Sequence, residues 1–145
     1  MATRRSSIGR FAPALSAVND PRFAGATQSE FEQARTELAS GEPATLKQCV
    51  AESSNAVESA MKVLLTERSV TFAEGDAAFK LFDRLVDASI VPRFMERVIL
   101  GPAVARNKSG GHGAGVLPHV VPREMAEAAL ASAAVAIAYL HARLP

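Results

Sequence analysis

A glycine-rich stretch between two helical patterns carries the residues best suited to chemistry. Its polar and glycine residues are, in order, Arg106, Asn107, Lys108, Ser109, Gly110, Gly111, His112, Gly113 and Gly115. Arginine presents a fixed fork of donors that suits a phosphate, and histidine changes its charge near neutral pH. Glycines let the backbone take positive φ angles and approach a ligand closely. The stretch is therefore the candidate working site.

Five residues, two of them glycines, separate Arg106 from His112, so the backbone can curl until both side chains face one phosphodiester. The guanidinium would pair with the non-bridging oxygens, and the imidazole would take a proton from a ribose 2′-hydroxyl or give one to the leaving oxygen. Because RNA carries its own nucleophile, this chemistry requires no metal and no cofactor. Lys108 adds a second cation, and Asn107 could orient the phosphate or the histidine.

Two other interpretations of the same loop involve no chemistry. The loop could bind a phosphate without turning it over, or it could be a flexible connector whose histidine faces solvent. The G-x-x-x-x-G-K pattern of a phosphate-binding Walker loop is absent, and an R-x5-H spacing is not specific by itself. Cys49, His119 and His141 show no zinc-ligand spacing with His112. Spacing alone therefore does not decide whether the loop is catalytic, binds a phosphate without chemistry, or only connects two helices.

The composition indicates one globular domain with a local anion site. The chain has 145 residues, of which 48% are hydrophobic and 21% charged, and its net charge is +1. Such a small net charge argues against wrapping of nucleic acid over the whole surface. A single cysteine fits a reducing compartment, and the most apolar run, 125–140, is shorter than the roughly 20 residues of a membrane span. We expect a cytoplasmic protein without a membrane partner.

The first half of the chain predicts a basic flexible arm followed by two helices. Residues 1–26 show no clean period. Thr27 and Glu30 have the spacing of a capping box, which predicts a helix over 28–40. A proline at a position that helices tolerate then opens a longer helix, from residue 43 to about 67. Residues 27–145 form the predicted domain.

The second half predicts further amphipathic helices and a break before the site. Asp76 is placed to cap the helix that follows it, and apolar spacing over 94–99 predicts another helix. Gly101–Pro102 interrupts the pattern, after which a short helical turn would fix Arg106 on a rigid end. An alanine-rich helix over 123–143 closes the chain. The predicted architecture is an all-α bundle.

The long helix carries one apolar and one polar stripe. The apolar stripe has helical spacing and should face the core: Leu46, Val50, Val57, Met61 and Leu64. Glu52, Asn55, Ser59 and Lys62 lie three or four residues apart, with Glu58 beside them. Such a stripe is most often a solvated helix face. The alternative is that it lies beneath the glycine-rich loop.

Three pieces of the chain, in order, resemble the C-terminal domain of abortive-infection-like proteins, the Abi-C type of HEPN fold. They are 55–62, the loop 106–115, and Val121–Pro122 opening the alanine-rich helix, and the resemblance covers about residues 28–142. It implies a HEPN-like bundle of about five helices that commonly forms a homodimer.

Many HEPN domains are metal-independent ribonucleases of toxin or phage-defence systems. Their signature is an arginine, a polar residue, and a histidine four to six positions after the arginine, which Arg106, Asn107 and His112 match. The resemblance implies an RNA-cleaving site where two loops meet across a dimer, and an antitoxin or defence-system partner. The alternative is a non-catalytic nucleotide-binding, RNA-binding or dimerisation module of the same type.

The resemblance also implies a supporting role for the stripe on the long helix. Glu52, Asn55 and Glu58 would support Arg106 or the loop, with Lys62 nearby.

Overall fold

The computed structural model describes residues 12–109 and 120–145, which form helices joined by short links, with no strand in these two ranges. The α-helices are α1 (Ala12–Val18), α2 (Ala26–Ser40), α3 (Pro43–Glu67), α4 (Ala78–Asp87), α5 (Glu96–Ile99), α6 (Gly101–Lys108) and α7 (Arg123–Ala142). Two 3-10 turns, η2 (Pro21–Phe23) and η3 (Arg93–Met95), lie between them. The predicted all-α bundle is confirmed.

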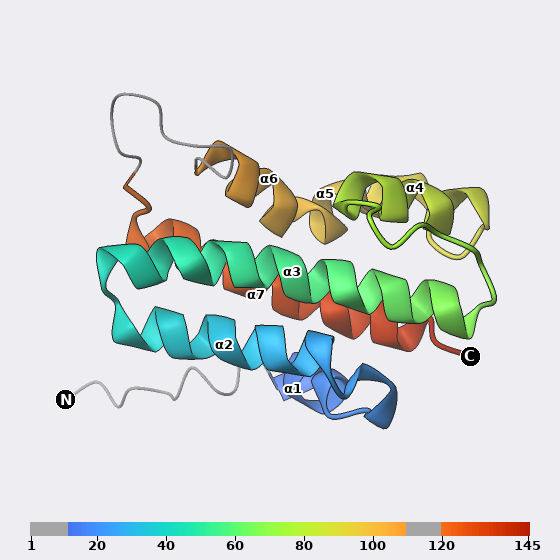
Figure 1. Ribbon diagram of the computed structural model, residues 1–145, viewed down its shortest axis with the longest axis horizontal. Helices are drawn as coiled ribbons and strands as arrows, with labels where there is room; N and C mark the ends of the chain where they lie inside the picture. Colours follow the sequence, from blue (N-terminus) through green and yellow to red (C-terminus); the bar gives the residue numbers. More distant parts are fainter. Residues whose placement is uncertain (1–11, 110–119) are drawn as a thin grey trace.

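Helix α3 is the central element of the bundle. It packs along α2 and α7, and α4 and α6 contact it in turn along its length (Figure 1). Pro43 occupies its first turn, where the missing N–H costs no hydrogen bond. The predicted apolar stripe is confirmed, because Leu46, Val50, Val57, Met61 and Leu64 are all buried.

Helix α7 packs closely against α3 through small side chains. Ala126, Ala129, Ala133 and Ala136 are buried, which lets the two backbones approach. Cys49 of α3 faces this contact and burial raises the pKa of its thiol to about 11, so the cysteine behaves as a small core residue.

Among the described residues, α7 is long and apolar enough to cross a membrane, having 20 residues. However, 44% of its apolar window is buried inside the bundle, and the core helix of a globular domain has the same composition.

The predicted N-terminal arm is partly packed against the bundle. Within residues 12–26, α1 contacts α7, and Ala17, Val18 and Phe23 are buried. These three side chains extend the core beyond the predicted domain boundary. Residues 1–11 of the arm lie outside the described part of the chain.

The capping-box prediction for α2 is wrong. The helix begins at Ala26, its N-cap is Gly25 with φ 110°, and no side chain caps it. Thr27 lies within the first turn and is buried, and Glu30 accepts a hydrogen bond from Ser59. A glycine that reaches positive φ therefore starts the helix two residues earlier than the polar pattern predicted.

Asp76 does not cap α4 as predicted. Its carboxylate accepts hydrogen bonds from the Ala73 N–H (3.0 Å) and from Arg84 Nε (2.6 Å), while the N-cap of α4 is Ala77 without a side-chain bond. Asp76 therefore closes the turn before α4 and links that turn to Arg84 of the helix.

The helix predicted over 94–99 is shorter than expected. Residues 93–95 form η3 and only Glu96–Ile99 form α5, which leaves Phe94 80% exposed. The break at Gly101–Pro102 is confirmed, as is the helical segment that carries Arg106.

Candidate functional site

Arg106 lies in the last turn of α6, and Lys108 is the final residue of that helix. The turn is closed by Ser109, whose N–H donates to the Ala105 carbonyl oxygen at 3.0 Å. The Ser109 hydroxyl also donates to the Arg106 carbonyl oxygen at 3.0 Å. The backbone of Arg106 is thus held at a defined helix end, immediately before the glycine-rich stretch.

Arg106 projects from the face of α6 that meets the bundle. Pro102, Ala103 and Ser109 are buried and lie three or four positions from Arg106, so they share its face. Arg106 is half-buried, whereas Asn107 and Lys108 are exposed. The arginine is therefore constrained by its neighbours in a way that the two following residues are not.

The start of α6 is fixed against α7 by a close backbone approach. A Cβ atom at Gly101 would lie 2.6 Å from the hydroxyl oxygen of Ser132. That hydroxyl donates to the Val98 carbonyl oxygen at 3.2 Å. A larger residue at this crossing would have to displace the Ser132 hydroxyl from its acceptor.

His112, Gly110, Gly111 and Gly113 lie outside the described residues, as does His119. The meeting of Arg106 with His112 therefore stays a prediction. The structure does show that α6 ends and α7 begins at the same end of the bundle, where α3 also begins (Figure 1).

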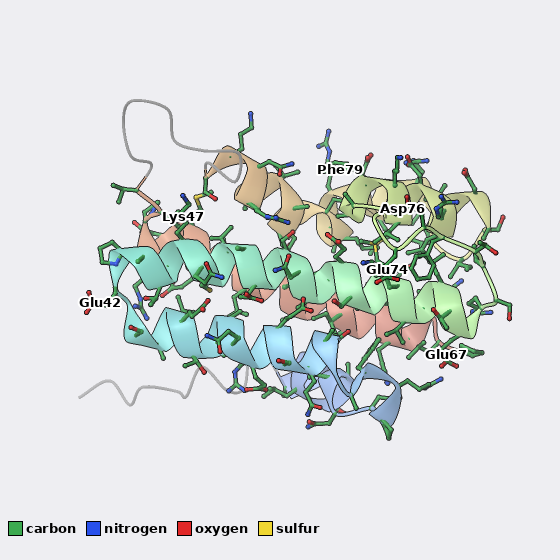
Figure 2. The ribbon with its side chains drawn as sticks, in the orientation of Figure 1. Glu42, Lys47, Glu67, Glu74, Asp76 and Phe79 are labelled. Carbon is green, nitrogen blue, oxygen red and sulfur yellow. The ribbon has the colours of Figure 1, made fainter. Side chains whose placement is uncertain are left out.

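One exposed cation at this end was missed in the sequence. Lys47 lies in the first turns of α3, toward the end at which α6 terminates (Figure 2). The sequence shows only that Lys47 precedes Val50, a residue of the apolar stripe, by three positions. That spacing could not place Lys47 at the end of the bundle where α6 terminates.

The polar stripe of α3 makes its contacts with α2 and with the turn before α4. Ser59 Oγ donates to Glu30 Oε1 at 2.9 Å, and Lys62 Nζ donates to the Glu74 carbonyl oxygen at 3.2 Å. Lys62 Nζ also lies 3.9 Å from a carboxylate oxygen of Glu58. Glu52 accepts from Gln48 on the same helix.

These contacts do not connect the stripe with Arg106. Within the described ranges, no hydrogen bond or ion pair joins Arg106 to any of the four residues Glu52, Asn55, Glu58 and Lys62. Their support of Arg106 or the loop stays a prediction.

Burial between α2 and α3 perturbs two carboxyl groups. Desolvation raises the pKa of Glu30 and of Glu37 above the ordinary glutamate value, although a hydrogen bond from Ser59 or Gln33 opposes the shift. In the described ranges, no three His, Cys, Asp or Glu side chains gather in a group that could hold a metal ion.

His141, near the C-terminus, contacts a residue from the start of the chain. Its Nε2 atom lies 3.0 Å from Asp20 Oδ2, and its ring centroid is 5.9 Å from that of Phe23. The histidine thus links the end of α7 to the turn after α1.

Comparison with known proteins identifies the fold family. A HEPN-like domain, Abi_C, matches residues 26–144, which is most of the chain and includes α2 to α7 as well as the loop. No curated protein and no solved structure matches the chain. The helical bundle and the extent of the match agree with the resemblance seen in the sequence. The chain belongs to the Abi_C family of HEPN-like domains.

Proposed function

We propose that this domain is a metal-independent endoribonuclease of the toxin or phage-defence type, in which Arg106 and His112 act on an RNA phosphodiester. The observation that carries the proposal is the placement of Arg106 on the bundle-facing side of the last turn of α6. The backbone at Arg106 is held at a helix end directly before a glycine-rich loop, so its guanidinium is available to an anion there. Membership in the HEPN-like Abi_C family supports the same function.

The reaction follows from the groups present in the substrate and in the loop. The ribose 2′-oxygen attacks the adjacent phosphorus, the bond from phosphorus to the 5′-oxygen breaks, and the products are a 2′,3′-cyclic phosphate and a 5′-hydroxyl. The His112 imidazole takes the 2′-hydroxyl proton, and an imidazolium gives a proton to the leaving oxygen. In a homodimer, two loops supply the two imidazoles. Arg106 pairs with the non-bridging oxygens as negative charge develops on them.

The exposed cations at this end of the bundle would guide the RNA backbone. Lys108 follows Arg106 by two residues, and Lys47 lies at the start of α3. Both are solvent-accessible, so their contribution is to phosphate binding and should weaken as salt rises. Control of such an activity by an antitoxin or another defence-system protein is part of the proposal.

A substrate that lacks the nucleophile tests the proposed chemistry. Purified protein is incubated in EDTA with an RNA, and with the same RNA carrying 2′-deoxy residues at the mapped cleavage positions. The RNA should be cut to 2′,3′-cyclic phosphate ends, and the substituted positions should resist. Cleavage at the substituted positions would contradict the mechanism. Saturable binding without cleavage of either substrate would assign the domain to the non-catalytic alternative.

A further inference from the structure

The start of α6, the helix that carries Arg106, lies against one serine of α7. A Cβ atom at Gly101 would be 2.6 Å from the hydroxyl oxygen of Ser132 and 3.6 Å from its Cβ atom. Ser132 is half-buried, and it is the one polar residue in residues 128–138 of α7, which otherwise consist of alanine, leucine, valine and isoleucine. A hydroxyl at this point of an apolar helix therefore calls for a structural reason.

The Ser132 hydroxyl supplies a donor that the backbone lacks where α5 ends and α6 begins. It donates to the Val98 carbonyl oxygen, in the four-residue helix α5, at 3.2 Å. In a continuous helix that oxygen would accept from the N–H of residue 102, but Pro102 has no N–H. Ser132 thus satisfies the carbonyl oxygen that the proline leaves free, and it links the junction of the two helices to α7.

The position of this junction affects Arg106 because α6 is short. The helix has eight residues. Arg106 follows Gly101 by five positions, which is about 7.5 Å along the helix axis at about 1.5 Å per residue. Pivoting α6 by about 10° at Gly101 would therefore move residue 106 by roughly 1.3 Å. A misplacement of about 1 Å can cost about 10²-fold in rate, so a residue that fixes the junction can control the site without touching RNA.

We propose that Ser132 is a positioning residue for RNA cleavage. By bonding the Val98 carbonyl oxygen across the break at Pro102, it sets the direction of α6 and hence the location of the Arg106 guanidinium. The inference rests on the ribonuclease function proposed above. It assigns a role in that function to α7, at a residue outside the glycine-rich loop.

Single-turnover cleavage at saturating RNA in EDTA tests the proposal. Ser132→Ala should lower the rate constant about tenfold. The RNA concentration at half-saturation should stay within about twofold, because Lys47 and Lys108 remain exposed. Ser132→Thr keeps the hydroxyl and should cleave at about the parent rate. The matched control is Thr66→Val, which removes another bond from a hydroxyl to a carbonyl oxygen, that of Lys62 at 2.9 Å, in the last turn of α3.

Gly101→Ala tests the same hydroxyl from the opposite helix. Its methyl group would meet the Ser132 hydroxyl and displace it from Val98, so the rate constant should fall about as far as in Ser132→Ala. In the double variant the second substitution should add no further loss, since both act through one hydrogen bond. Losses that multiply in the double variant would overturn the proposal.

Residual dipolar couplings of the backbone N–H groups of α6 and α7 measure the angle between the two helices without RNA. The angle should differ between the parent and Ser132→Ala, with thermal unfolding verifying that the variant folds, and Ser132→Thr should match the parent. An unchanged angle in Ser132→Ala would overturn the proposal, as would a loss of cleavage in Thr66→Val equal to that in Ser132→Ala.

The two proposals fail in distinguishable ways. Absence of RNA cleavage by the parent protein would overturn the ribonuclease function and, with it, the role of Ser132. Cleavage by the parent and by Ser132→Ala at the same rate would overturn the role of Ser132 alone.

Discussion

The two long sides of α3 pack against α2 and α7 with different kinds of residues. Toward α2 the contact includes polar groups, such as the Ser59–Glu30 hydrogen bond and the carboxyl of Glu37, which Gln33 donates to. Toward α7 the contact includes the buried Cys49, whose Sγ lies 3.9 Å from the Ala126 carbonyl oxygen, and α7 itself buries only alanine, leucine and isoleucine side chains. The α2 side of α3 therefore includes hydrogen-bonded polar groups, whereas the α7 side consists mainly of small and apolar side chains.

This difference shows which side of the molecule supports the candidate ribonuclease site. Arg106 is carried by α6, whose first residue touches Ser132 of α7. In the polar stripe of α3, Ser59 bonds to α2 and Lys62 bonds to the turn before α4. Changes near α6 should therefore alter RNA cleavage, and changes between α2 and α3 should alter stability.

The largest expected effect comes from the arginine itself. Arg106→Ala should lower single-turnover RNA cleavage about 10²–10³-fold, which is the usual loss when one group that stabilises developing charge is removed. Its unfolding free energy should change little, since the side chain is only half-buried. Arg35→Ala is the matched control, because Arg35 pairs with Glu32 on the exposed side of α2. Equal loss of RNA cleavage in both variants would contradict the assignment of cleavage to the α6 side of the molecule.

The buried apolar side of α7 should dominate stability. Leu130→Ala, at a side chain that is 1% exposed, should cost about 2–5 kcal/mol of unfolding free energy in urea titrations. Val135→Ala on the same helix should change it by less than about 0.5 kcal/mol, because Val135 is 58% exposed. Comparable losses for the two residues would mean that α7 packs differently from the structure described.

The close approach of α6 to α7 should give a smaller effect on unfolding free energy, and that effect should depend on Ser132. Gly101→Ala should cost about 1–2 kcal/mol, since the new methyl group would meet the Ser132 hydroxyl at 2.6 Å. In a Ser132→Ala background that cost should largely disappear, because the next atom is 3.6 Å away. A double-mutant cycle of unfolding free energies measures the coupling. Additive costs would rule out this contact as the one that sets the position of α6.

The smallest expected effect is a pH dependence of the unfolding free energy, which arises where α2 packs on α3. Burial raises the pKa of Glu37 in the folded protein, so the folded state favours the protonated form. The stabilisation that this shift provides is fully present below the pKa of Glu37 in the unfolded chain. It is lost as pH rises through the pKa of Glu37 in the folded protein. Glu37→Gln should therefore be more stable than the parent at pH 7, with the difference shrinking toward pH 4. Urea titrations at both pH values measure it, with the exposed Glu32→Gln as control. A difference that grows on acidification would contradict the sign.

Much of the fold could be predicted because apolar spacing determines which helix faces are buried. The stripe of α3, the break at Gly101 and the short helix that carries Arg106 all follow from local pattern. Helix starts were less predictable, since Gly25 rather than Thr27 begins α2 and Asp76 bonds across its turn. Local spacing does not reveal which distant group competes for a polar side chain.

The contacts of the candidate site depended even more on tertiary structure. The sequence identified Arg106 and its helix, but it did not show that Ser59 bonds to α2 or that Lys62 bonds to the turn before α4. The same is true of His141, whose partner Asp20 is more than a hundred residues away in the chain. Pairings of this kind depend on how the helices are arranged, and no single segment encodes them.

The central claim is that an imidazole of the glycine-rich loop acts with Arg106 on RNA. Its most direct test compares RNA cleavage in EDTA by the parent, His112→Ala and His141→Ala, with folding verified by circular dichroism. Loss of general acid–base catalysis predicts an activity about 10²–10⁴-fold lower for His112→Ala. His141→Ala should retain activity, since His141 lies against Asp20 at the far end of α7. Full activity in folded His112→Ala would contradict the account.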